Sequence, residues 1–156
     1  MSLSNHDILA KAMVNILAVY GFEVHYKIKG KETEEIRVVG DSGLNYYPDI
    51  YAKKGYTTLI GDIRTRAQRG TKDEIDRYVV QFLQAELDDM VAKLHRPHGL
   101  IVAAHGADED TTRLAAHFGI YLVHLPLEVA QSIAPLDPVS QRQKIIEIAR
   151  KNKIEF

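Results

Sequence analysis

The chain has 156 residues, of which 46% are hydrophobic and 26% charged, and its 20 basic residues nearly balance its 21 acidic ones. At this size one domain is the default, and ordinary apolar content with a net charge of −1 excludes a disordered chain. No apolar run approaches the roughly 18 residues of a membrane-spanning helix, and the absence of cysteine excludes disulfides, thiolate metal sites and a cysteine nucleophile. A cytoplasmic protein is expected, and nucleic-acid binding would need a local basic patch.

The first half of the chain passes from a helical pattern to strand patterns. Ser4 is suited to cap a helix whose apolar residues recur at helical spacing. The period then changes to two, as in half-buried strands. Pro48 breaks one of these strands because it cannot donate to a ladder, and Lys54-Gly55 fits a tight reversal. The predicted elements are a helix over residues 4–20 and strands over about 22–28, 36–39, 44–53 and 56–64, with 36–39 returning as a partner of 22–28.

The second half predicts a parallel strand–helix–strand unit and a helical tail. Thr71 and Glu74 form a capping box before a long amphipathic helix. Asp137 followed by Pro138 is typical of a helix start. The predicted elements are a helix over about 71–94, a strand over 99–104, a helix from 110 that ends at Gly119, a parallel strand over 120–123 and a last helix over about 137–151. We expect a single mixed α/β domain over residues 1–156, with its core at about 4–124 and a helical tail at about 126–156.

The chemistry concentrates in the hairpin over residues 48–64. Asp49 and Asp62 are placed symmetrically about the reversal, so they should face each other across neighbouring strands. Two such carboxylates repel unless a positive charge lies between them, and Mg²⁺ or Mn²⁺ prefers carboxylate and carbonyl oxygens. Arg64 projects on the same face as Asp62 because side chains alternate along a strand. A metal site beside a fixed cation suits hydrolysis of a phosphodiester.

Pro48-Asp49, the apolar hairpin and Asp62-Ile63-Arg64 resemble a variant of the PD-(D/E)xK nuclease signature. With Gly21-Phe22 upstream, the layout is most similar to archaeal Holliday junction resolvases, over about residues 4–104. The resemblance implies a restriction endonuclease-like three-layer sandwich with a mixed central sheet, made of an αβββαβ core plus an αβ extension and the tail. It also implies a homodimeric, Mg²⁺- or Mn²⁺-dependent endonuclease that cuts DNA, with branched or junction DNA as one substrate class. Asp49, Asp62 and the backbone carbonyl of Ile63 would hold the metal, and Arg64 would take the place of the catalytic lysine.

The motif departs from the family pattern at three points. Asp62 replaces the commoner glutamate, and Arg64 stays protonated, so it can stabilise charge but cannot act as a general base. The first helix has no glutamate at the expected level, residues 9–11, and Asp7, about a turn earlier, is the nearest candidate for a further metal ligand. These departures leave open a second function, that of a nuclease-fold subunit that binds nucleic acid or assembles with partners without cutting.

Two further groups of side chains are candidates for binding. The first is a set of basic residues near the hairpin that would follow nucleic-acid phosphates: Lys53, Lys54, Arg66, Arg69 and Lys72. The second is the pair His105 and His124, each of which follows a predicted parallel strand at its carboxyl end, where open α/β sheets bind ligands. This pair leaves open a third function, small-molecule binding by an α/β protein.

Overall fold

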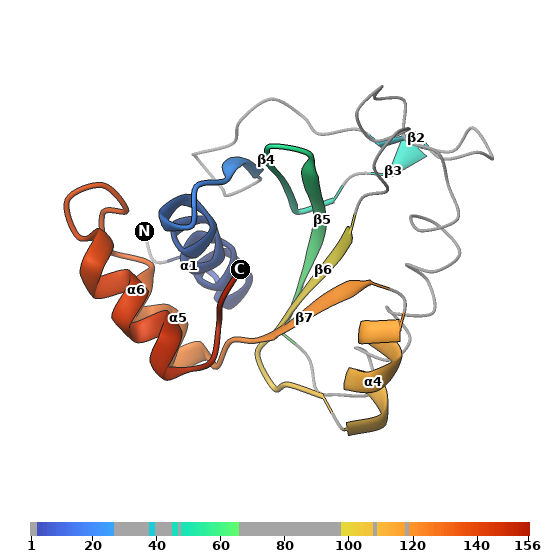
Figure 1. Ribbon diagram of the computed structural model, residues 1–156. Helices are drawn as coiled ribbons and strands as arrows, with labels where there is room; N and C mark the ends of the chain where they lie inside the picture. The colour runs from blue at the N-terminus through green and yellow to red at the C-terminus, as the bar shows by residue number, and fades with distance from the viewer. Residues whose placement is uncertain are drawn as a thin grey trace.

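A computed structural model describes most of the chain as a sheet between helices (Figure 1). The described residues are 3–26, 38–39, 45–46, 48–65, 98–107, 109–117 and 119–156, with 38–39 and 45–46 described by their backbone. The helices are α1 (Asn5–Val19), α4 (Glu109–His117), α5 (Leu127–Ile133) and α6 (Arg142–Lys151). The strands are β1 (Glu23–Tyr26), β2 (Val38–Val39), β3 (Asn45–Tyr46), β4 (Ile50–Lys54), β5 (Thr57–Arg64), β6 (His98–Ala103) and β7 (Ile120–His124).

The main sheet has the strand order β1-β4-β5-β6-β7. The pairs β1–β4 and β4–β5 are antiparallel, whereas β5–β6 and β6–β7 are parallel. The sheet is therefore mixed, and β5 is the strand at which the direction of pairing changes. As a result, β5, β6 and β7 end at the same edge of the sheet, at Arg64, Ala103 and His124.

Helix α1 lies between the sheet and the C-terminal helices α5 and α6, while α4 lies on the other face (Figure 1). One apolar cluster runs from Leu9 in α1 through Leu59 and Ile63 of β5 to Ile145 in α6. Ile60 and Ile101 are fully buried but lie outside that cluster, as expected for the alternate face of the same strands. The predicted α/β sandwich of three layers around a mixed sheet is confirmed.

The helical tail is part of this core. Asn15 of α1 is fully buried, and its Nδ2 donates to the carbonyls of Ile133, Ala134 and Leu136 at 3.0–3.3 Å. These carbonyls belong to the last residue of α5 and to residues that follow it, where a helix leaves acceptors without partners of its own. The final residue, Phe156, meets the rings of Tyr20 and Phe22 edge to face.

Two sequence predictions are wrong in detail. Residues 38–39, predicted to pair with the strand over 22–28, instead pair with β3 in a separate two-stranded sheet, and the strand that pairs with β1 is β4. The last helix starts at Arg142 and not at Asp137, because the Asp137 side chain accepts from Val139 N–H and Ser140 Oγ and holds a separate turn. The break before β4 is confirmed, and so are the tight reversal after Lys54 and the parallel pairing of β6 with β7.

The predicted helix over 71–94 lies outside the described residues. None of the helices that the structure describes is both long and apolar enough to cross a membrane.

Candidate functional site

The β4–β5 hairpin brings Asp49 and Asp62 to neighbouring positions. Asp49 lies directly before β4, one step beyond the Ile50–Gly61 pair of the ladder. Its backbone N–H donates to the Gly61 carbonyl at 3.0 Å and to Oδ1 of Asp62 at 3.3 Å. The two acidic residues therefore lie across adjacent strands, as their spacing about the reversal predicts.

The side chain of Asp49 accepts a backbone hydrogen bond at the point where the regular pairing of the two strands ends. Pro48 is buried and has no N–H, so regular pairing cannot continue through it. The Oδ2 atom of Asp49 instead accepts the backbone N–H of Ile63 at 3.0 Å. This bond fixes the Asp49 carboxylate against β5, on the strand that also carries Asp62 and Arg64.

Arg64 connects the second carboxylate with the backbone between the two motif residues. One terminal nitrogen of its guanidinium lies 3.5 Å from Oδ2 of Asp62, and the other donates to the Ile63 carbonyl at 3.2 Å. The side chains of Asp62 and Arg64 are 20% and 26% exposed, so both groups remain within reach of solvent. The planar fork of arginine allows one side chain to hold both acceptors.

His6, in the first turn of α1, places an imidazole against Asp49, and this imidazole adds a second positive charge when it is protonated. Its Nε2 lies 3.2 Å from Oδ2 of Asp49, and this hydrogen bond, opposed by burial, raises the pKa of His6 above its usual value of 6.5. Burial alone would raise the pKa of Asp49, but the hydrogen bonds from His6 and from Ile63 N–H lower it overall. Asp49 is therefore a carboxylate at neutral pH, paired with an imidazole that is readily protonated.

Sequence reasoning missed His6 because 43 residues separate it from Asp49 and only the fold brings them together. The available signal was that His6 lies on the first helix, where the resemblance places a glutamate, although at the level of residues 9–11. Asp7, the predicted further ligand, has its backbone N–H bound to Ser4 Oγ at 3.1 Å, and its Oδ1 lies 3.7 Å from Nδ1 of His6. Asp7 therefore borders the site through His6.

The donors at this site fit Mg²⁺ in kind. Asp49, Asp62 and the Ile63 carbonyl are hard oxygen ligands on adjacent strands, and Mg²⁺ commonly uses one or two carboxylates and completes its shell with water or phosphate. Among the residues that the structure describes, no group of three or more His, Cys, Asp or Glu side chains could hold a metal ion. A set of two carboxylates and one carbonyl would suit a cation that keeps much of its water, and it does not suit a closed zinc site.

The predicted phosphate-binding lysines lie at the other end of the hairpin. Lys53 is four residues along β4 from Asp49, roughly 13 Å at about 3.3 Å per residue. Lys54 Nζ donates to the carbonyl of Tyr20 at 2.7 Å, at the end of α1, and Lys53 Nζ lies 5.4 Å from the ring of Tyr51. The structure does not bring these lysines to the carboxylates.

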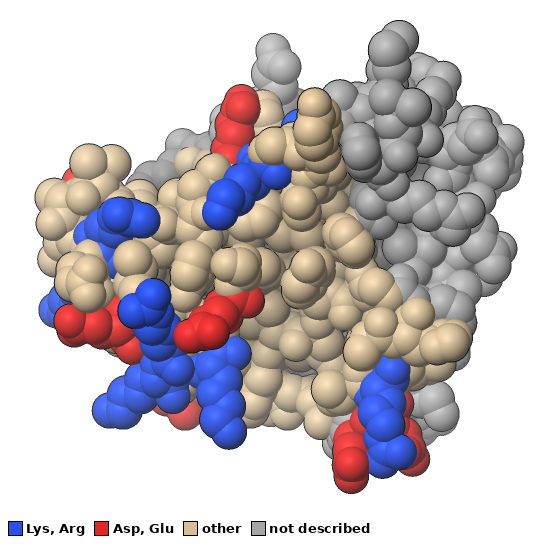
Figure 2. Space-filling model, viewed as in Figure 1, with Lys and Arg blue, Asp and Glu red and all other residues tan. Residues whose placement is uncertain are grey.

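Arg66, Arg69 and Lys72 lie outside the described residues. On the described surface that faces the viewer in Figure 2, blue and red side chains are interspersed over the α5–α6 side and do not form one continuous basic field. On this face, the described surface therefore shows no continuous basic patch that could extend the carboxylate site.

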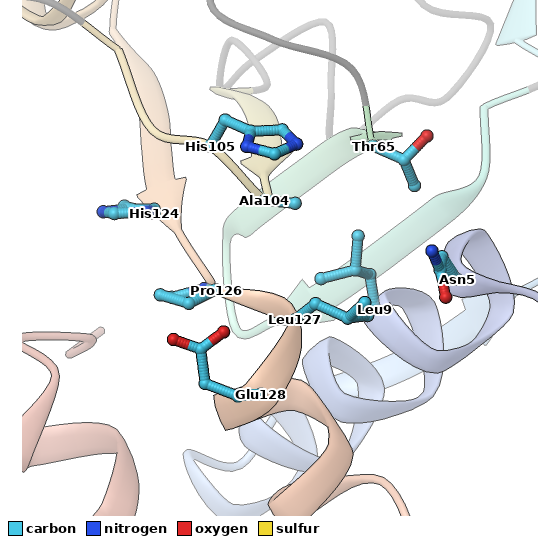
Figure 3. Close-up of a pocket in the computed structure, with 9 residues that line it drawn as sticks. All are labelled: Asn5, Leu9, Thr65, Ala104, His105, His124, Pro126, Leu127 and Glu128. Carbon is cyan, nitrogen blue, oxygen red and sulfur yellow. The ribbon is translucent and has the colours of Figure 1, made fainter.

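His105 and His124 border one cavity of about 500 Å³ at the carboxyl edge of the parallel strands (Figure 3). Thr65, directly after β5, and Asn5, at the start of α1, also line it. Gly106 has φ +71°, and a side chain there would approach the ring of His124 to about 3.1 Å, so the glycine allows the ring to lie against the backbone. The predicted ligand position at these strand ends thus coincides with a cavity.

No family model and no curated protein sequence matches the chain. Among solved structures, the chain is similar to a protein of unknown function, AF1548, with 16% identity and a TM-score of 0.56 over 94% of this chain and 78% of that chain. It is also similar to the small subunit (R.BspD6I2) of the heterodimeric restriction endonuclease R.BspD6I, with 10% identity and a TM-score of 0.42 over 88% and 74% of the two chains. At this identity the likeness to AF1548 concerns the fold alone.

Proposed function

We propose that the protein is a divalent-metal-dependent endonuclease that hydrolyses phosphodiesters in DNA. The observation that carries the proposal is the convergence of Asp49 and Asp62 on adjacent strands, with the Arg64 guanidinium 3.5 Å from Asp62. In this proposal Asp49, Asp62 and the Ile63 carbonyl hold Mg²⁺ or Mn²⁺. The bound ion would lower the pKa of a water ligand and polarise the phosphoryl oxygen.

The residues of the chain would supply the remaining electrostatics. Arg64 carries a permanent charge beside the carboxylates, which can stabilise the extra negative charge of a phosphodiester as it is attacked. Ile63 N–H orients the Asp49 carboxylate through its 3.0 Å bond to Oδ2. The guanidinium of Arg64, and the imidazole of His6 when it is protonated, would reduce the repulsion between the two acids without a metal.

A cleavage assay with purified full-length protein tests this proposal. Wild type is incubated with Mg²⁺ or Mn²⁺ and four-way junction, flap or linear duplex DNA, beside Asp49→Asn and Asp62→Asn. Asp110→Asn is the matched control, because Asp110 is a 94% exposed carboxylate on α4. We expect metal-dependent cleavage by wild type and Asp110→Asn, and loss of cleavage in the two site variants. Equal background in all four proteins contradicts the proposal, and Mn²⁺ titration by electron paramagnetic resonance measures metal binding without relying on activity.

A second candidate function is nucleic-acid binding or assembly without cleavage. It is favoured by the contacts of the site, where His6 lies against Asp49 and Arg64 against Asp62, so that an imidazole and a guanidinium already neighbour the two carboxylates that a metal would use. Salt-sensitive DNA binding that needs no metal and survives Asp62→Asn would support this function over cleavage. A homodimer remains part of the proposal, and sedimentation of the free protein would test it.

A further inference from the structure

Two residues that line the cavity at the carboxyl edge are chain neighbours of residues in the carboxylate site. Asn5 directly precedes His6, and Thr65 directly follows Arg64. Ala104 N–H donates to the Arg64 carbonyl at 3.0 Å, which joins the cavity wall to the strand that carries Asp62. One extended ligand could therefore place one part at the carboxylates and another part in the cavity.

The cavity has an apolar side and a polar side. Leu9, which is fully buried, and Leu127 line one side, and Thr65 and His105 flank the other (Figure 3). Asn5 adds an amide at the rim. A hydroxyl, an amide and an imidazole can each donate or accept, so this rim can match the edge of a flat heterocycle while the leucines contact its face.

Charge argues against a phosphate in the cavity. Its described lining holds His105 and His124 but no lysine or arginine, and Glu128 contributes a carboxylate at its edge. A phosphate in this position would meet that carboxylate and would lack the permanently charged donors that usually bind it. A neutral heterocycle does not meet that cost, and a volume of about 500 Å³ falls within the range of cavities that hold small organic groups.

We infer that this cavity receives an unpaired nucleobase of the strand whose phosphodiester lies at Asp49 and Asp62. The inference rests on the proposed function and names its substrate class: DNA with an unstacked nucleotide beside the scissile bond, as in a flap, a bulge or a junction. In intact duplex the base must first be unstacked and unpaired, which costs free energy that an already unpaired base does not require. The cavity thus favours irregular DNA without reading its sequence.

Fluorescence of 2-aminopurine tests the inference without cleavage. The full-length protein is titrated in Ca²⁺ with DNA that carries one unpaired 2-aminopurine, and with a matched duplex in which the same base is paired. Stacked 2-aminopurine is quenched, so we expect a rise of at least twofold when the unpaired base leaves the stack. We expect at least fivefold tighter binding of the bulged DNA than of the duplex, and anisotropy of an end label measures both affinities.

Ala104→Leu fills the cavity and is compared with Ala116→Leu on the exposed side of α4. We expect Ala104→Leu to abolish the fluorescence rise and the preference for bulged DNA while duplex affinity stays within twofold, and Ala116→Leu to behave as wild type. His105→Ala, with the exposed α4 residue His117→Ala as its control, replaces this pair if a thermal melt shows that Ala104→Leu does not fold. Binding without a fluorescence rise, or a rise that the filled cavity leaves unchanged, overturns the inference and leaves the proposed function standing. Absence of both binding and cleavage at low salt overturns the proposed function and the inference with it.

Discussion

Two polar clusters lie near opposite ends of α1, and they satisfy their hydrogen bonds in different ways. Near the C-terminal end, Asn15 is fully buried, its Nδ2 donates to backbone carbonyls, and its Oδ1 accepts from Lys11 Nζ at 2.9 Å. At the N-terminal end, about 13 Å away at roughly 1.5 Å per residue, His6 meets Asp49, which is 22% exposed and charged. The first cluster closes the contact between α1 and the tail. The second keeps carboxylate oxygens within reach of solvent, as a ligand site requires.

The difference predicts that the cluster around Asn15 mainly affects stability and that the carboxylate cluster mainly affects activity. A buried amide that serves three carbonyls is costly to remove, because the carbonyls of Ala134 and Leu136 lose this donor, whereas the carbonyl of Ile133 keeps the Leu136 N–H. Partly exposed ion pairs contribute less, typically below about 1 kcal/mol. Substitutions at the carboxylates should therefore change function while the fold persists, and substitutions at Asn15 should do the reverse.

The largest expected effect is on cleavage by the carboxylate variants. Asp49→Asn and Asp62→Asn should each lower the Mg²⁺-dependent rate at least a hundredfold, which corresponds to about 2.7 kcal/mol of barrier. The free energy of unfolding should change by about 1 kcal/mol or less, because the amide can still accept a hydrogen bond. Single-turnover rates and urea unfolding measure the two quantities. If a carboxylate variant lost activity only because it unfolded, the claim that the two clusters have different roles would be contradicted.

The second effect is on stability. Asn15→Ala should lower the free energy of unfolding by about 2–4 kcal/mol, since the carbonyls of Ile133, Ala134 and Leu136 lose their shared donor inside the core. Asn152→Ala is the matched control, because Asn152 makes a single 2.8 Å bond to the Ile148 carbonyl at the end of α6. We expect the control to cost about 1 kcal/mol. A larger loss at Asn152 than at Asn15 would contradict the structural role of the buried amide.

The strands of the β4–β5 hairpin and their pairing could be predicted because the sequence signals for them are local. Pro48, the reversal after Lys54 and the alternation of side chains together bring Asp49 opposite Asp62. The partners that complete the two clusters come from distant elements. Asn15 and the carbonyl of Leu136 are 121 residues apart, and no local pattern distinguishes Asn15 from an exposed polar residue on a helix. The expected pairing of the strand over 36–39 with β1 is wrong for a related reason: short strands of similar pattern do not specify their partners.

A third prediction concerns the two bonds of Arg64. Arg64→Lys keeps the charge but cannot reach Asp62 and the Ile63 carbonyl together, because an ammonium is a single point and not a planar fork. We expect about a tenfold lower cleavage rate, equivalent to about 1.4 kcal/mol. Arg113→Lys on α4, where the arginine is 68% exposed, is the control and should leave the rate unchanged. A faster Arg64→Lys enzyme would mean that the fork is not needed and that a lysine serves the chemistry better.

The smallest expected effect is the contribution of the His6–Asp49 pair to stability without metal. The pKa of His6 is raised in the folded protein by its hydrogen bond to Asp49, so its contribution is complete below about pH 6.5 and is lost as the pH rises through the folded value. The pKa of Asp49 is lowered, despite burial, by its bonds from His6 and Ile63 N–H, so its contribution is present above about pH 4 and is lost as the pH falls through the folded value.

The pair should therefore stabilise the fold most between about pH 4 and pH 6.5, by roughly 0.2–1 kcal/mol, because the 40% exposed imidazole is screened by solvent. Urea unfolding of wild type and His6→Gln at pH 5.5 and pH 8.5, in EDTA, measures the difference, with His117→Gln as a control outside the pair. The gap between wild type and His6→Gln should shrink at the higher pH. A gap that widens there would mean that neutral His6, and not its ion pair, stabilises Asp49, and that the two clusters on α1 are more alike than their charges indicate.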